Sequence, residues 1–220
     1  MKQVIHIHNP RTAGMSMRIW ARRRFSPYQS LYRFGTAYKA DGLWQPSFDP
    51  AIMWTYLGHS LAVDLMKGGI FDQEWYDSCF KFVFVRNTWT RMVSHFEQER
   101  AYRIRRHRKR MESYLRSFEA YVDYVVSLAA SYRHNNKQLV WLQSGVDFIG
   151  RFENIEKDWE RLCKLVGVKY TSLLHANVVP RKIDQRFVKP GGWRGFYTKK
   201  TRRIVANFYA EEIEHFGFSY

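Results

Sequence analysis

The chain has 220 residues, of which 45% are hydrophobic and 17% aromatic. This composition excludes an intrinsically disordered chain, because such chains lack the apolar surface that offsets the entropy lost on folding. Lys and Arg number 36 against 20 Asp and Glu, and the net charge of +16 indicates an anionic partner: a phosphorylated cofactor, an acidic glycan, nucleic acid or an anionic membrane.

Several sequence patterns are absent from the chain, and their absence predicts its domain count, its compartment and the state of its cysteines. No repeat and no linker rich in Pro, Gly or Ser divides it, so we expect a single domain over residues 1–220. No apolar run reaches the length of a membrane span and no signal-peptide pattern occurs, so we expect a cytoplasmic protein without a membrane span. Cys79 and Cys163 do not have the spacing of a zinc or redox pair, and we expect two reduced, buried thiols.

In chain order, the first predicted elements are a strand and a helix joined by a turn. The apolar run at residues 4–8 predicts the strand, and apolar residues at helical spacing predict a helix over 16–24. Residues 26–50 are rich in aromatics, Gly and Pro but have no sustained period, which predicts irregular structure or a short helix.

The same order of strand, turn and helix then recurs. Residues 79–87 are almost continuously apolar, which is typical of a central parallel strand buried on both faces. The other elements predicted after residue 50 are a short strand from residue 52, helices over 88–102, 115–125, 155–167 and 198–216, and a short strand over 146–150. Strands that alternate with helices predict an α/β fold, with helices packed on a mostly parallel sheet.

The first turn, residues 9–16, carries side chains suited to an anion. In an α/β fold such a turn lies outside the carboxyl end of a strand, where a helix N-terminus presents unpaired N–H groups and a partial positive charge. Gly14 lets the backbone approach a ligand, and Arg11 supplies a bidentate cation. Thr12 and Ser16 add hydroxyl donors. A phosphate cradle and a plain strand-helix connection both fit this segment alone, but a Walker A loop is excluded because its lysine is absent.

A second pair of polar residues follows the predicted central strand. Arg86 stands at the end of that strand, and Ser94 lies in the helix after it. The two side chains would hold a second phosphate. The alternative is a surface arginine followed by an ordinary serine on a helix face.

Four stretches, taken in order, resemble the sulfotransferase family, most closely its glycan O-sulfotransferases of the heparan 2-O and chondroitin type. "HNPRTAGMS" (8–16) is similar to the family's 5′-phosphosulfate loop, H-I-P-K-T-[GA]-G-T-S, and "FVFVRNTWTRMVSHF" (82–96) is similar to its 3′-phosphate motif. "DFIGRFENIEKDWERLCKLVGV" (147–168) and "FYTKKTRRIVANFYAEEIEHFGF" (196–218) resemble its remaining landmarks.

The resemblance implies a P-loop-like three-layer fold and a metal-free reaction. A sulfuryl group would pass from 3′-phosphoadenosine 5′-phosphosulfate (PAPS) to a hydroxyl, or as a second choice an amine, of an acceptor, leaving 3′,5′-adenosine bisphosphate (PAP). By position, the residues that would wrap the 5′-phosphosulfate are Arg11, Thr12, Ala13, Gly14, Met15 and Ser16. Arg86 and Ser94 would bind the 3′-phosphate. A late loop with Gly192, Trp193 and Arg194 would cover the nucleotide.

Three positions depart from the family's pattern. Arg11 stands where the family has lysine; its guanidinium would neutralise charge on the leaving phosphate as a catalytic cation, but it cannot donate a proton as an ammonium does. Thr88 replaces the usual proline, which we expect to change only the stiffness of the turn. Asn9 replaces an apolar residue, and the sequence offers no reason for it.

His59 is the predicted catalytic base. It follows Gly58 at the end of a predicted strand, where similar sulfotransferases carry a Gly-His pair. A histidine pKa near its ordinary value of about 6.5 suits the removal of a proton from an acceptor hydroxyl near neutral pH. The alternative is a histidine with a purely structural role.

The basic stretch 100–110, with six Arg and one Lys, is the predicted place for an anionic acceptor, and we expect that acceptor to be a carbohydrate. Arg100, Arg103 and Arg106 are its predicted substrate-binding residues. A solvated helix face is the alternative interpretation of this charge.

Two further functions compete with sulfuryl transfer. A P-loop-type kinase would need a Walker A lysine and an aspartate that holds Mg²⁺, and neither is found. A protein that binds polyanions or nucleic acid without catalysis would show affinity that falls steeply with salt. We expect no obligate nucleic-acid partner.

Overall fold

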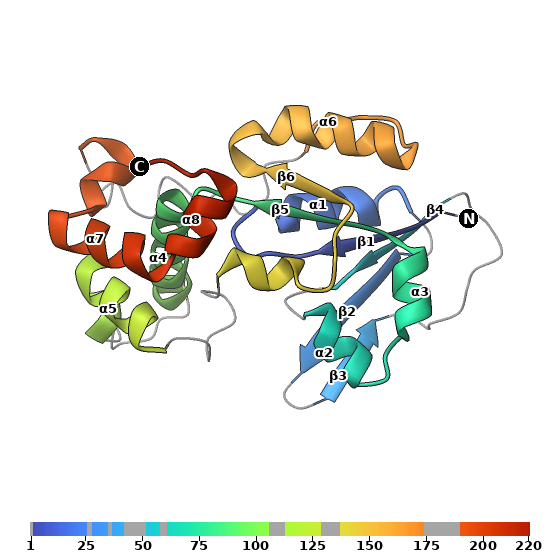
Figure 1. Cartoon of the computed structure of the whole chain (residues 1–220), viewed down its shortest axis with the longest axis horizontal. Coiled ribbons are helices and arrows are strands. Elements are labelled where there is room, and N and C mark those ends of the chain that lie inside the picture. Colours follow the sequence, from blue (N-terminus) through green and yellow to red (C-terminus); the bar gives the residue numbers. More distant parts are fainter. Residues whose placement is uncertain are drawn as a thin grey trace. The chain divides into compact units, whose positions relative to one another are not determined.

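The computed structural model describes residues 2–25, 28–34, 37–41, 52–57, 61–105, 113–128, 137–173 and 190–220. The chain forms two compact units. Unit 1 comprises Met1–Val85 and Gln138–Ala176, and unit 2 comprises Arg86–Lys137 and Asn177–Tyr220. Figure 1 shows the elements of both units. The single domain predicted over residues 1–220 stays a prediction.

Unit 1 is built on a six-stranded sheet with the order β3-β2-β4-β1-β5-β6. The strands are β1 (Lys2–Ile7), β2 (Tyr28–Phe34), β3 (Ala37–Asp41), β4 (Ile52–Tyr56), β5 (Phe80–Val85) and β6 (Phe148–Arg151). Every neighbouring pair is parallel except β2 with β3. The α/β class and the mostly parallel sheet are therefore as predicted. The irregular structure or short helix predicted over 26–50 was wrong for β2 and β3. Pairing with β4 and with each other stabilises these strands although they show no sequence period.

Helices pack on both faces of this sheet. In unit 1 they are α1 (Gly14–Arg22), α2 (Ala62–Lys67), α3 (Gln73–Ser78), η4 (Gln138–Leu142), η5 (Phe152–Asn154) and α6 (Ile155–Val166). Alternate residues of β1 and β5 point to opposite faces, so each strand contributes to two buried clusters. Val4 and Phe82 belong to the cluster beneath α1 and α6, whereas Ile5 and Val83 belong to the cluster beneath α2 and α3. Unit 1 thus has three layers.

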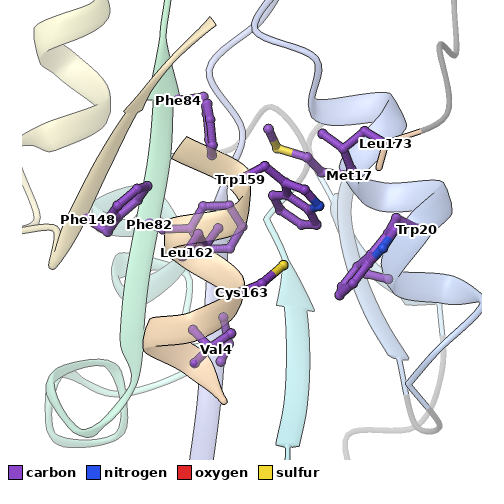
Figure 2. Close-up of a cluster of buried hydrophobic side chains, with 12 residues drawn as sticks. Val4, Met17, Trp20, Phe82, Phe84, Phe148, Trp159, Leu162, Cys163 and Leu173 are labelled. Atoms are coloured by element: carbon purple, nitrogen blue, oxygen red, sulfur yellow. The ribbon is translucent and has the colours of Figure 1, made fainter. Parts of the chain in front are cut away.

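Trp159 of α6 is the central side chain of the first cluster. It is fully buried, and its ring meets Trp20 of α1 edge-on at 4.8 Å between centroids. Figure 2 shows this indole among side chains of β5, α1 and α6. Burial of a large apolar side chain contributes about 1.5–3 kcal/mol, so this contact anchors both helices to the sheet. Because α1 begins directly after the first turn, its anchoring also fixes where that turn ends.

Unit 2 is helical. Its elements are α4 (Thr88–Arg105), η1 (Ser113–Leu115), α5 (Phe118–Leu128), η7 (Gly192–Phe196), α7 (Lys199–Phe208) and α8 (Ala210–Phe216). Phe96 of α4 is buried and contacts the rings of Phe118 and Phe196, with centroids 5.4 and 6.1 Å away. The single helix predicted over 198–216 divides at Tyr209, which is buried and lies between α7 and α8.

The two cysteines are buried free thiols, as predicted. Burial raises the pKa of Cys79 and that of Cys163 to about 11, so both are protonated at neutral pH. Within the ranges given above, no helix is both long and apolar enough to cross a membrane.

His6 gives unit 1 a stability that depends on pH. Its ring is buried and stacked on Phe82 at 4.6 Å, and burial lowers its pKa to about 3. The unfolded chain takes up this proton near pH 6.5 and the folded chain only near pH 3, so the free energy of unfolding falls as the pH falls through this window. In urea titrations, the wild type should lose about 2 kcal/mol more than His6→Phe between about pH 7 and about pH 5. Equal losses in the two proteins would contradict the assignment.

Candidate functional site in the turn after β1 and at the start of α4

The turn between β1 and α1 is the strained segment of unit 1. Arg11 and Ala13 both have positive φ, at 69° and 68°, although neither is a glycine. A residue with a Cβ pays about 1–2 kcal/mol for this left-handed conformation. Such turns direct successive N–H groups to one side and form concavities that bind anions. The conformation is therefore the one expected of an anion cradle.

Two backbone donors lie at the mouth of this turn. Within the described residues, the N–H groups of Gly14 and Met15, the first two residues of α1, donate to no acceptor. The first turn of α1 contains no acidic side chain that would neutralise them. The helix N-terminus therefore offers unpaired donors and a partial positive charge to an anion.

Thr12 and Ser16 are less accessible than the sequence suggests. Both are buried, and the Thr12 hydroxyl donates to the Asn9 carbonyl at 2.7 Å. In this conformation the Thr12 hydroxyl proton is used inside the turn, so the Thr12 side chain fixes the shape of the loop. Arg11 is half-buried.

The side chain of Asn9 ties the start of the turn to neighbouring elements of unit 1. It is fully buried, and its Nδ2 donates to the Phe84 carbonyl at 3.0 Å and to Gln138 Oε1 at 2.9 Å. Sequence reasoning missed Asn9 and Gln138 as parts of the site. The only signal in the sequence was the departure of Asn9 from the apolar residue of the family's loop.

Gly14 has a steric role besides close approach to a ligand. A Cβ at this position would overlap the His8 imidazole, which is itself buried. The glycine therefore allows α1 to start directly against the end of β1.

The second predicted phosphate site lies at the start of α4 in unit 2. Asn87 caps the helix, because its Oδ1 accepts from the N–H of Trp89 at 3.1 Å. Arg86 Nε donates to Thr90 Oγ1 at 3.1 Å, which ties the guanidinium to the first turn of α4. Ser94 lies further along α4 and is buried. This part of unit 2 places a cation at a helix N-terminus, an arrangement that suits a phosphate.

Thr88 does more than change the stiffness of the turn. Its side chain is buried, and its hydroxyl donates to Glu212 Oε1 at 2.6 Å. Glu212 is fully buried in α8. A proline at position 88 would not supply this donor, so Thr88 joins the start of α4 to the C-terminal helix.

The late loop is packed by its own aromatic and cationic residues. Gly191 and Gly192 have positive φ and open η7. The Arg194 guanidinium lies 4.2 Å above the Trp193 ring, and the Tyr220 ring lies 5.1 Å from that ring. One face of the half-buried Trp193 is thus already covered by Arg194.

The remaining predicted residues are only partly described. His59 and Arg106 lie outside the described residues, and for Arg103 only the helical backbone is described. Arg100 is half-buried, with its guanidinium 5.1 Å from the centre of the Phe96 ring. Among the described side chains, no group of three or more His, Cys, Asp or Glu is arranged to hold a metal ion.

The comparisons with known proteins identify the family. Residues 64–219, which are more than half of the chain, match the sulfotransferase family, and the chain belongs to it. The fold is similar to that of mouse sulfotransferase SULT7A1 complexed with PAP, with a TM-score of 0.53 and 12% identity over 97% of this chain and 85% of that chain. A comparison with curated proteins finds no match. The predicted sulfotransferase family and P-loop-like fold are thereby confirmed.

The contact between Gly14 and His8 predicts a specific steric conflict. Gly14→Ala should lower the free energy of unfolding by about 1–3 kcal/mol, because its methyl group overlaps a buried ring. His8→Ala should remove most of the additional loss when the two changes are combined. Urea titrations of the four proteins measure this coupling, and additive losses would show that the two residues do not interact.

The buried hydrogen bond of Thr88 predicts a stability loss in unit 2. Thr88→Val should lower the free energy of unfolding by about 1–3 kcal/mol, because it removes a donor from a fully buried carboxylate. Ser127→Ala is the matched control: its hydroxyl bonds an exposed helix carbonyl, so its loss should stay within about 0.5 kcal/mol. Chemical denaturation compares the two variants, and equal losses would contradict the assignment.

Proposed function

We propose that this protein transfers a sulfuryl group from PAPS to a hydroxyl of an acceptor, in the manner of the glycan O-sulfotransferases. The observation that carries the proposal is the strained turn before α1, in a chain of the sulfotransferase family. Its left-handed residues and unpaired N–H groups provide what a phosphosulfate needs, which is several donors aimed at one anion. Two non-glycine residues in this conformation are typical of a functional turn.

Within unit 1, Arg11 is the proposed catalytic cation. During transfer, the bond from sulfur to the bridging phosphate oxygen breaks, a bond forms to the acceptor oxygen, and negative charge develops on the leaving phosphate. A guanidinium neutralises that charge and stays protonated throughout. The proton of the acceptor hydroxyl must go to a base, and the resemblance assigns this role to His59.

Within unit 2, Arg86 and Ser94 are the proposed ligands of the 3′-phosphate. The guanidinium of Arg86 is held to the first turn of α4, and the helix N-terminus adds partial positive charge. Gly192, Trp193 and Arg194 are the proposed cover of the nucleotide. Because Arg194 occupies one face of Trp193, we assign adenine contact to this loop as a whole and not to stacking on both faces of Trp193.

The proposed acceptor is an anionic or hydroxylated carbohydrate. The net charge of +16 and the six Arg residues of the basic stretch 100–110 favour a polyanionic chain. Among the predicted acceptor ligands, Arg100 is held against the Phe96 ring.

Thermal stabilisation by ligands tests the proposed function. PAP at 100 times its Kd should stabilise the folded protein by about 2.7 kcal/mol, which raises the melting temperature. ATP with Mg²⁺ should give a smaller shift, because it lacks the 3′-phosphate. A folded protein whose melting temperature does not respond to PAP would refute the proposal. A larger shift with ATP and Mg²⁺ would favour the kinase.

Variants of the two catalytic candidates separate binding from chemistry. His59→Ala should leave the PAP shift intact and lower kcat by about 10²–10⁴-fold, because only proton transfer is lost. Arg11→Ala should reduce the PAP shift and lower kcat. Arg11→Lys, which restores the family's residue, should keep the affinity for PAP. Radiolabelled sulfate transfer to a glycan panel measures kcat. Retained turnover in His59→Ala would remove this histidine from the mechanism.

A further inference from the structure

We propose that Asn9 is a positioning residue for the sulfate-binding turn, an inference that rests on the proposed function. Its side-chain amide continues the pairing of β1 with β5 after the β1 backbone has turned away. It thereby holds the turn in the left-handed conformation that presents its N–H groups.

The hydrogen bonds of Asn9 carry the first step. The last register pair of β1 and β5 is Ile7 with Val83. Beyond it, the Asn9 N–H donates back to the Ile7 carbonyl at 3.2 Å, so this N–H does not bond β5. The Asn9 side chain takes over and donates to the carbonyl of Phe84, the next residue of β5.

The same side chain is fixed from a second direction. Its other amide hydrogen is donated to Gln138 Oε1 at 2.9 Å, and Gln138 is fully buried in η4. Because both acceptors require an N–H donor, the orientation of the Asn9 amide is determined. The position of Asn9 is thus set by β5 and η4 together.

Asn9 also holds the turn that follows it. Its carbonyl accepts the Thr12 hydroxyl at 2.7 Å, and the two left-handed residues, Arg11 and Ala13, lie on either side of Thr12. Each left-handed residue costs about 1–2 kcal/mol, so a turn with free ends would relax. The bonds of Asn9 prevent this relaxation by tying the start of the turn to the sheet.

A cost in stability indicates that this asparagine does more than fill the core. Its Oδ1 is buried and has no hydrogen-bond partner within the described residues. An unsatisfied buried acceptor costs about 1–3 kcal/mol, a penalty that a leucine of similar size would not incur. A buried polar side chain with an unsatisfied atom breaks a packing rule, and such departures are expected at functional sites.

The test compares PAP binding and turnover with stability. In Asn9→Leu, the Kd for PAP should rise and kcat/KM should fall by at least about tenfold, because the N–H groups of the turn are no longer aligned. Calorimetry gives the Kd, and assays are run well below the melting temperature of each variant. Tyr76→Phe is the matched control, since it removes the hydrogen bond from the Tyr76 hydroxyl to the Gly145 carbonyl in the cluster beneath α2 and α3, to which α1 does not contribute. It should lower stability without changing either value.

A double-mutant cycle with Gln138→Met distinguishes positioning from a general loss of packing. Alone, Gln138→Met should raise the Kd for PAP by about threefold, because one of the two amide bonds remains. In the Asn9→Leu background it should add nothing, because its effect passes through Asn9. If Asn9→Leu does not fold, the Kd of Gln138→Met for PAP decides: a rise of about threefold supports the role of Asn9, and an unchanged Kd overturns it.

The outcomes separate this inference from the proposed function. If the wild type binds PAP and Asn9→Leu binds it equally well with unchanged kcat/KM, only the role of Asn9 is overturned. Equal losses in Asn9→Leu and Tyr76→Phe overturn it as well. If the folded wild type has no affinity for PAP, the proposed function fails and the inference fails with it.

Discussion

The parallel pairing of β1 with β5 is the constraint on which the candidate site in unit 1 depends. It brings the ends of two strands to one edge of the sheet, and Asn9 extends it by one side-chain bond to the Phe84 carbonyl. From this point the chain makes a strained turn and enters α1, whose position is fixed by Trp20 against Trp159. The strain of the turn is sustained because both of its ends are held.

The fold class and the order of the central elements could be predicted from the sequence. The uninterrupted apolar residues of β5 indicate a strand covered on both faces, and its two buried clusters bear this out. The strands β2 and β3 could not be predicted, because their stabilisation comes from pairing with other strands and not from alternation. The break between α7 and α8 at Tyr209 could not be predicted either, because the helical spacing of apolar residues continues through it.

The candidate site was predictable in residue type but not in geometry. The motif identifies Gly14 as a candidate site residue. The structure shows that any larger residue at this position would overlap the ring of His8, a contact that no local sequence pattern encodes. The partners of Asn9 and Thr88 are far away in sequence, at Gln138 and Glu212. Long-range hydrogen bonds of this kind explain two departures from the family's loops, and both act by fixing backbone that lies beside proposed ligands.

The proposed function requires the protein to bind a nucleotide through its 5′-phosphosulfate end and through its 3′-phosphate. Titration calorimetry that compares the affinities of the protein for PAP and for adenosine 5′-monophosphate is the direct test, because the two ligands differ only in the 3′-phosphate. We expect PAP to bind at least about tenfold more tightly, since charge-assisted hydrogen bonds to the additional phosphate are gained. Equal affinities, or no binding of PAP to the folded protein, would contradict it.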